Sequence, residues 1–167
     1  MIVRDATDDD IRHVCRNLRP EDRAEQLAIR WSDDVDDLAA ELIDWRRLAI
    51  RQTALLTDDG EPAVIVGAYL KGPAVAAFHM CSTPALRRIG REGHVWGKRR
   101  FIPLVLVPNV RLAETRIMAA HEAARRWVAA CGFREVGPPL PFGKAGEDFV
   151  HVAWINPTPP GDADVPR

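Results

Sequence analysis

The 167-residue sequence has little cysteine, a single tyrosine and almost no net charge. Its three cysteines, Cys15, Cys81 and Cys131, are odd in number and widely spaced, which argues against a disulfide framework and a C-x-x-C metal pair. The formal net charge of −1 gives no electrostatic reason to expect nucleic acid as a partner. We therefore expect a protein of a reducing, cytoplasmic compartment.

Long apolar runs are also missing. The longest strongly apolar run, residues 101–108, is far too short to span a bilayer, so no membrane segment is expected. The acidic N-terminus lacks the apolar stretch of a signal peptide. The chain is long enough for one domain with a substantial core, which we place at residues 1–156. The Pro-rich residues 157–167 are expected to form a flexible tail.

Apolar spacing and turn residues predict strands and helices along the first half of the chain. Polar N-caps and a proline mark the helix starts, and the Asp58-Asp59-Gly60 turn predicts a hairpin. In order, we expect a strand at 2–4, helical regions from Thr7, Pro20 and Ser32, and strands at 54–57, 63–70 and 74–81.

The segment between residues 83 and 113 allows two interpretations. Pro103 and Pro108 argue against a regular helix, and FIPLVLV resembles a buried strand. A helix from about residue 94 to 112, with Pro103 near its first turn or at a kink, is favoured by one apolar face. That face would hold Phe101, Leu104, Val105, Pro108 and Leu112.

The clearest pattern lies at residues 114–137, which read as a strand at 115–119, a helix, a Gly-Phe stop and a strand at 133–136. Gly132 occupies the position where a left-handed cap favours glycine, and Phe133 can fold back onto the helix. A final strand is expected at 149–155. The helix face, at i, i+3, i+4, i+7, i+8 and i+11, is Ala120, Ala123, Ala124, Trp127, Val128 and Cys131.

This module resembles the fifth strand, fourth helix and sixth strand of the GNAT superfamily of acyl-CoA-dependent N-acyltransferases. The family often reads N-x-x-A-x-x-L-Y-x-x-x-G-F there. The resemblance implies an α/β fold whose mixed, mostly antiparallel central sheet is flanked by helices, in the order β-α-α-β-β-β-α-β-α-β-β. In this sequence the motif positions are His121, Ala124, Trp127, Val128, Gly132 and Phe133.

The resemblance also implies acetyl-CoA as cofactor, with its pyrophosphate at the N-terminus of the central helix. The family motif there is Arg or Gln, two residues, Gly, one residue, and Gly or Ala. Arg87 and Gly90 match, Glu92 stands where a small residue belongs, and Gly93 comes one place late. A solvated basic surface is the alternative role. The candidate cofactor-binding residues are Arg87, Arg88, Gly90, Arg91 and Gly93.

Acyl transfer to an amine needs a base for the ammonium and an acid for the leaving thiolate. Val128 stands at the family's tyrosine position, and the only tyrosine, Tyr69, belongs to another strand. His79 on the fourth strand and His121 at the family's Asn position are the candidate catalytic bases. A hydrogen-bonded structural histidine and a helix cap are their respective alternatives. No spacing of His and Cys indicates a metal site.

Several short segments are similar to a divergent GNAT group encoded by phages and prophages. Some members of that group are internal or tail-associated virion proteins of short-tailed phages. Two functions follow from the resemblance: an N-acyltransferase of an unknown amine substrate, or a non-catalytic virion protein with virion proteins as partners and the virion as its location. The similar segments are residues 18–25, 121–127 with 132–133, 142–149, and Pro108.

Overall fold

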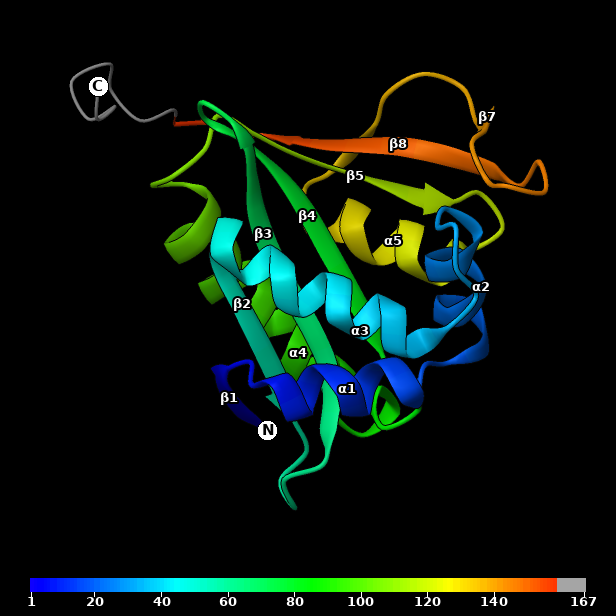
Figure 1. Cartoon of the computed structure of the whole chain (residues 1–167). Helices are drawn as coiled ribbons and strands as arrows, with labels where there is room; N and C mark the ends of the chain where they lie inside the picture. Colours follow the sequence, from blue (N-terminus) through cyan, green and yellow to red (C-terminus); the bar gives the residue numbers. More distant parts are fainter. Residues whose placement is uncertain (159–167) are drawn as a thin grey trace.

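The structure is a computed structural model that describes residues 1–158 (Figure 1). Its elements follow the predicted order, with one additional short strand, β7. The helical regions expected from Thr7, Pro20 and Ser32 are α1, α2 and α3, one helix more than the family order has before its second strand. The predicted tail lies, from residue 159 on, outside the described residues. Two elements are not α-helices or strands: η1 is a 3₁₀-helix and η2 a π-helix. The bounds are β1 Ile2–Asp5, α1 Asp8–Arg16, α2 Pro20–Ala28, α3 Val35–Asp44, η1 Trp45–Leu48, β2 Ala49–Leu56, β3 Pro62–Gly72, β4 Val75–Ser82, α4 Leu86–Trp96, η2 Gly97–Leu106, β5 Leu112–Met118, α5 Glu122–Ala130, β6 Arg134–Glu135, β7 Leu140–Pro141 and β8 Asp148–Ile155.

The central sheet is mostly antiparallel, as predicted. Its strand order is β1-β2-β3-β4-β5-β8-β6, and β7 also pairs with β8. The exception is the parallel pair β4–β5, which is joined only at Val75–Leu112, Ala76–Ala113 and Ala77–Glu114. β3 and β4, in contrast, pair along nearly their whole length. β4 and β5 therefore separate after Ala77, and this opening sets the position of the candidate site.

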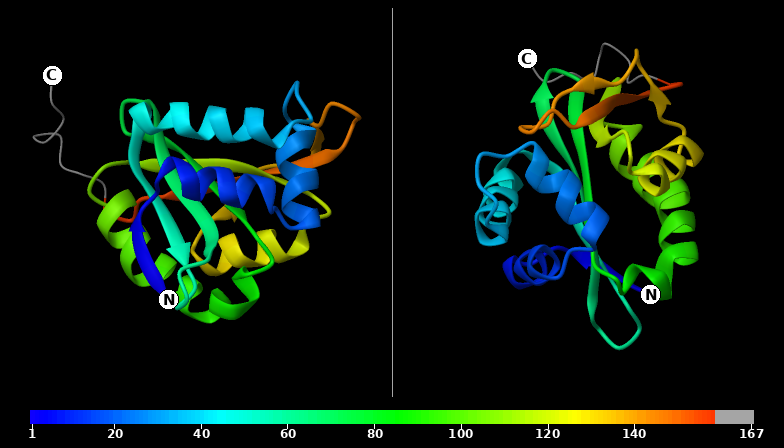
Figure 2. Two further views of the ribbon diagram at one scale, coloured as in Figure 1. Left: turned by 60° about the horizontal axis from the view of Figure 1, so that its bottom comes forward. Right: turned by 90° about the vertical axis from the view of Figure 1, so that its right-hand side faces the viewer.

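Helices cover both faces of the sheet (Figure 2). The helices α1, α2 and α3 lie on one face, and α4, η2 and α5 lie on the other. Successive residues of a strand point to opposite faces, so β4 contributes to both cores. Phe78 packs in the core with Ile89 and Val128, while Cys81 packs with Ile11 and Leu38. None of the helices among residues 1–158 is long and apolar enough to cross a membrane.

The N-cap predicted for α1 is confirmed, whereas the N-cap of α3 lies two residues after the predicted one. Thr7 caps α1 in a reciprocal pair, in which Asp10 N–H donates to Thr7 Oγ1 and Thr7 N–H donates to the Asp10 carboxylate. Ser32 was expected to cap α3, but Asp34 does so, accepting from the N–H of Asp36 at 2.8 Å. The Ser32 hydroxyl instead accepts a hydrogen bond from the N–H of Asp34, at 3.0 Å, just before the helix.

The prediction for the central helix, residues 94–112, is wrong at both ends. The α-helix starts at Leu86, because Thr83 accepts the N–H of Ala85 through its hydroxyl and the N–H of Leu86 through its carbonyl. Helical structure continues as η2, which contains Pro103 in its interior, and stops at Leu106. Arg111 N–H already bonds to Ala74 O at 2.7 Å, so this part of the chain has entered the sheet. Residues 86–93, which the prediction left before the helix, are therefore helical.

The end of α5 has the predicted geometry. Gly132 has φ +95°, and Phe133 N–H donates back to Val128 O at 3.1 Å. The Phe133 side chain is buried. It contacts Phe78 at a ring separation of 5.2 Å, and Trp127 stacks on the same phenylalanine at 6.3 Å. The helix stop therefore delivers two aromatic rings to the opening between β4 and β5.

Candidate active site

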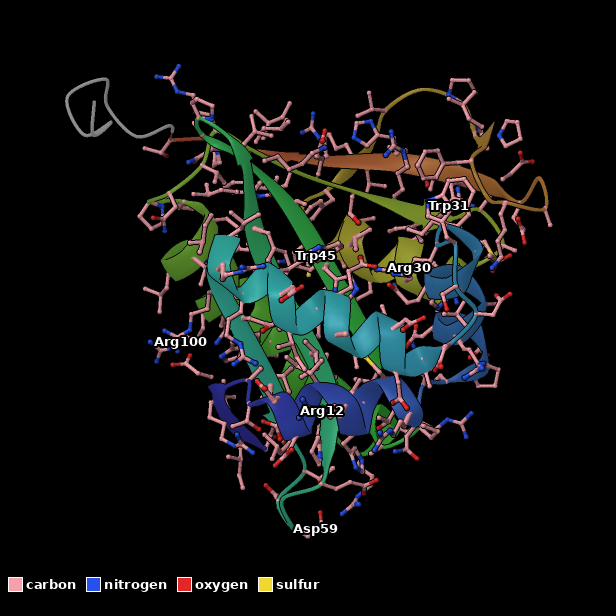
Figure 3. All side chains as sticks on the ribbon, in the orientation of Figure 1. Arg12, Arg30, Trp31, Trp45, Asp59 and Arg100 are labelled. Carbon is pink, nitrogen blue, oxygen red and sulfur yellow. The ribbon has the colours of Figure 1, made fainter. Side chains whose placement is uncertain are left out.

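A cavity of about 560 Å³ opens where β4 and β5 separate. Its walls come from α2, α3, β4, β5 and α5, and the segment joining β7 to β8 lies at its mouth. Figure 3 shows Arg30, Trp31 and Trp45 placed around α2 and α3 on this side of the molecule. The cavity brings together both predicted catalytic histidines with residues that are distant in sequence. Central wall residues are Glu25, Gln26, His79, Ile117, His121 and Val128.

A second cavity, of about 180 Å³, lies on the opposite face of the sheet, between α4, η2 and α5. Most of its wall is apolar, with Val66, Phe101 and Phe133 among the lining residues. Four residues line both cavities, so the two cavities meet through the opening in the sheet. These shared residues are Phe78, Met80, Ala124 and Trp127.

Two stacked aromatic rings form the boundary between the cavities. The rings of Phe78 and Trp127 are 6.3 Å apart with an angle of 19° between their planes. Gly97 lies beside the indole: a Cβ added at that position would be in ordinary van der Waals contact with Trp127 Cζ2, at 3.4 Å. The sequence places Trp127 on a helix face and at a family motif position, but not at a boundary between two cavities. Its role as a boundary depends on the separation of two strands, which the sequence does not display.

A shallow basic hollow adjoins the apolar cavity on the outer surface of α4 and η2. Gly90 and Trp96 line both the hollow and the apolar cavity. The hollow, the apolar cavity and the larger cavity therefore follow one another from the surface of α4, through the sheet, to the α2/α3 side. The hollow's cationic side chains are Arg87, Arg88, Arg91, Arg99 and Arg100.

All five predicted cofactor-binding residues (87, 88, 90, 91 and 93) lie inside α4 rather than in a loop before it. The N–H groups of Arg87 and Arg88 bond to Pro84 O and Ala85 O at 3.2 and 2.9 Å, so these backbone donors are already used. Arg88 also pairs with Asp59 and Glu61 at 2.8 and 3.0 Å. The remaining basic side chains, rather than a backbone cradle, are the groups available to an anion.

His79 is buried in the wall of the larger cavity. Its Nε2 lies 2.9 Å from Gln26 Oε1, which also accepts from Arg30, so His79 Nε2 carries the hydrogen. Within residues 1–158, His79 Nδ1 has no hydrogen-bond partner. Burial, with a smaller effect of Arg30, lowers the pKa of His79 to about 3. The imidazole is therefore neutral at pH 7.

His121 precedes α5 and pairs with a carboxylate of α2. Its Nδ1 lies 3.1 Å from Glu25 Oε2, and this hydrogen bond raises the pKa of His121. The same oxygen of Glu25 accepts the N–H of Met118 at 2.9 Å. His121 Nε2 is buried without a hydrogen-bond partner among the described residues, and Asp22 Oδ1 is 3.7 Å away. His121 is therefore a carboxylate-paired imidazole at the opening of the sheet.

Sequence reasoning missed Asp22 and Glu25 as site residues. Both are buried, and Asp22 also accepts the N–H of Ser82 at 2.9 Å. Their i, i+3 spacing on a helix was the available signal, since it places two carboxylates on one face.

Tyr69 does not line the cavity. It is buried against Trp45, accepts a hydrogen bond from Gln52, and burial raises its pKa. Residues 1–158 hold no group of three or more His, Cys, Asp or Glu that could hold a metal ion.

No protein-family model and no curated protein sequence matches the chain. Solved structures match its fold at low identity. A GNAT superfamily phosphinothricin acetyltransferase from Sinorhizobium meliloti, in complex with AcCoA, has a TM-score of 0.72 at 16% identity. The match covers 99% of this chain and 92% of the acetyltransferase chain. The ribosomal-protein-alanine N-acetyltransferase of Brucella melitensis has a TM-score of 0.70 at 16% identity. The match covers 93% of this chain and 99% of that protein's chain.

A third similar structure is the spermidine N-acetyltransferase of Vibrio cholerae in complex with CoA and spermine. It has a TM-score of 0.63 at 12% identity and covers 94% of this chain and 96% of its own. At these identities the likeness is one of fold, and the fold is that of GNAT N-acetyltransferases. All three are acetyltransferases.

Proposed function

We propose that this chain is an acyl-CoA-dependent N-acyltransferase with an amine acceptor. One observation carries the proposal: the basic hollow, the apolar cavity and the larger cavity follow one another through the opening between β4 and β5. Acyl-CoA combines anionic phosphates, a long thioester-bearing arm and a small acyl group, in the same succession. When bound, it would supply an activated acyl group. The similar structures bound to AcCoA and to CoA support this assignment.

The residues on the α4 side fit such a cofactor in part. The side chains of Arg87 and Arg91 line the hollow and would attract phosphates. A Cβ at Gly90 would meet nothing within 4 Å, so the space beside this glycine is open to a ligand. Gly93 lines the apolar cavity. Arg88 would support the site indirectly, because its pairs with Asp59 and Glu61 hold the β2–β3 turn against α4.

The amine would enter the larger cavity and lose a proton there. His79, with a pKa of about 3, is a weak base at neutral pH. His121 is the better base, because Glu25 fixes its Nδ1 as a donor and raises its pKa. We assign to His121 the acceptance of the ammonium proton, through a water, and to His79 the positioning of Gln26 and Arg30.

The chain has no tyrosine positioned to protonate the leaving thiolate. Val128, which lines the larger cavity, stands at the family's tyrosine position. As the new C–N bond forms and the C–S bond breaks, the thiolate would leave as an anion and take its proton from solvent. A general acid contributes roughly a hundredfold or more in rate, so we expect a slow enzyme.

The test is release of the CoA thiol from acetyl-CoA with a panel of amines. We expect amine-dependent turnover that falls about a hundredfold in His121→Gln, while acetyl-CoA affinity stays within twofold. Fast turnover that is unaffected by both His79→Ala and His121→Ala would show that the chemistry lies elsewhere. Absence of both turnover and acetyl-CoA binding would refute the enzyme and leave the virion-protein alternative.

A further inference from the structure

The larger cavity has a wall of unusual mixed character, which bears on what it binds. We infer that its ligand is an amphipathic cation: an amine on an aromatic or other apolar body, without a carboxylate. This inference rests on the proposed function, in which the cavity receives the acceptor. It follows from three features of the wall: its charge, its exposed apolar residues and its unpartnered polar atoms.

The charge of the wall is negative. Six carboxylates and three cations line the cavity. Three of the carboxylates are paired with cations: Glu41 with Arg30 at 3.0 Å, Glu114 with Lys71, and Asp22 with Arg19 at 2.9 Å. Glu25, Asp34 and Asp37 are then set against the one remaining wall cation, Arg116, among the described residues. An excess of carboxylates in a concave site favours a cationic ligand over a neutral or anionic one. The carboxylates are Asp22, Glu25, Asp34, Asp37, Glu41 and Glu114, and the cations are Arg30, Lys71 and Arg116.

The mouth of the cavity is apolar. Trp31 is fully exposed, with a relative accessibility of 104%, and Phe142 and Ile29 are exposed at 47% and 38%. All three line this one cavity. Exposed apolar residues gathered at one concave site mark an interaction surface, whereas singly scattered ones are normal and mark nothing. Asp37, on the first turn of α3, lies in the same wall and supplies a charge for the amine.

The two sides of the mouth are held together. Lys144 N–H donates to Ala28 O at 2.8 Å, and Lys144 Nζ lies 2.5 Å from Asp33 Oδ1. These contacts tie the segment after Phe142 to the chain on either side of Trp31. The two segments that carry Phe142 and Trp31 are therefore held to each other beside the cavity, so an apolar ligand body would not have to order a free loop to reach them.

The polar floor supplies an independent observation. His79 Nδ1 and His121 Nε2 are buried without a hydrogen-bond partner among residues 1–158, and both histidines line the cavity. Buried polar atoms of this kind are uncommon in native proteins, because a buried polar atom that makes no hydrogen bond destabilises the fold. A donor N–H, from the amine or from a water that it carries, would satisfy them.

Arg116 is the wall cation that could bind a ligand carboxylate. Its guanidinium lies 4.1 Å above the Phe142 ring at the mouth. It would attract a carboxylate if the ligand carried one. The ligand panel must therefore separate amines from the corresponding amino acids.

The experiment is calorimetric titration of the full chain, without acyl-CoA, with matched ligands. The probes are tryptamine against tryptophan, phenethylamine against phenylalanine, and 1,4-diaminobutane as a cation without an apolar body. We expect the two arylalkylamines to bind at least tenfold more tightly than the other three. Trp31→Ala and Asp37→Asn should each weaken tryptamine binding at least fivefold. The controls Leu104→Ala and Asp9→Asn change exposed residues outside the cavity and should leave binding unchanged.

Tighter binding of the amino acids would overturn the inference and assign Arg116 to a carboxylate. Tighter binding of 1,4-diaminobutane, or binding of none of the five, would also overturn it, as would equal effects of the cavity and control variants. The same ligands in the thiol-release assay separate this inference from the proposed function. Turnover with other amines alone contradicts the inference but not the function. Arylalkylamine binding without turnover of any amine contradicts the function but not the inference.

Discussion

Glu25 Oε2 and His121 Nδ1 lie 3.1 Å apart, although 96 residues separate them in the sequence. Their contact joins α2 to the start of α5 across the opening between β4 and β5. Glu25 also accepts a hydrogen bond from the N–H of Met118, at the end of β5. Among the described residues, it is the one residue of α2 that does so. The pair therefore fixes both the orientation of the proposed base and the width of the opening.

The Glu25–His121 pair predicts a pH-dependent contribution to stability. The pKa of His121 is raised above the ordinary 6.5, first by Glu25 and further by Asp22, against burial and Arg19. Its stabilisation is therefore complete below pH 6.5 and is lost as the pH rises through the folded-state pKa. We expect the stability difference between the wild type and Glu25→Gln to shrink from pH 5.5 to pH 8.5 in urea unfolding. A difference that grows with pH would contradict the pairing.

His79 predicts the opposite trend on the acid side. Its folded-state pKa is about 3 against an ordinary 6.5, so its contribution is present above pH 6.5 and is lost as the pH falls toward 3. The wild type should lose up to about 1.4 kcal/mol per pH unit below 6.5 from this group. His79→Gln, which cannot titrate, should unfold with a shallower acid dependence. Parallel acid profiles of the two proteins would show that His79 is not the cause.

Gly132 and Gly90 form a matched pair for backbone effects. Gly132 has φ +95°, so Gly132→Ala should destabilise by about 1 kcal/mol or more. Gly90 lies within α4 with open space beside it, so Gly90→Ala should be neutral or stabilising by up to about 1 kcal/mol. Thermal unfolding of both variants measures this. Gly90→Ala should nevertheless weaken acetyl-CoA binding if the cofactor uses that space.

Trp127 is predicted to limit the length of the acyl group. Because its ring separates the two cavities, Trp127→Leu should join them and raise the rate with butyryl-CoA relative to acetyl-CoA, by about fivefold or more. The measurement is kcat/KM for an acyl-CoA series. Trp96→Leu, a tryptophan that lines only the apolar cavity and the hollow, is the control and should not change the ratio. An unchanged ratio in Trp127→Leu would place the acyl group elsewhere.

The confirmed predictions rest on sequence signals that act within a few residues of one another. The α5 helix, Gly132 and Phe133 were predictable because spacing, a glycine cap and a following apolar residue act within a few residues. The start of α4 was not, because its N-cap, Ala85, has no side-chain cap, and the turn that precedes it is closed by Thr83. β2 starts at Ala49, not 54, since its polar residues Arg51 and Gln52 are compatible with pairing to β3. The Glu25–His121 contact and the separation of β4 from β5 arise only from tertiary packing.

The most direct test of the whole account is a calorimetric titration with acetyl-CoA up to millimolar concentration. We expect saturable binding of one molecule per chain. Arg87→Ala combined with Arg91→Ala should weaken it about a hundredfold, since each charged phosphate contact contributes roughly 1.5 kcal/mol. Arg12→Ala, on α1 at the opposite face (Figure 3), should have no effect. No saturable response at millimolar acetyl-CoA, or equal losses in the α4 and α1 variants, would contradict the account.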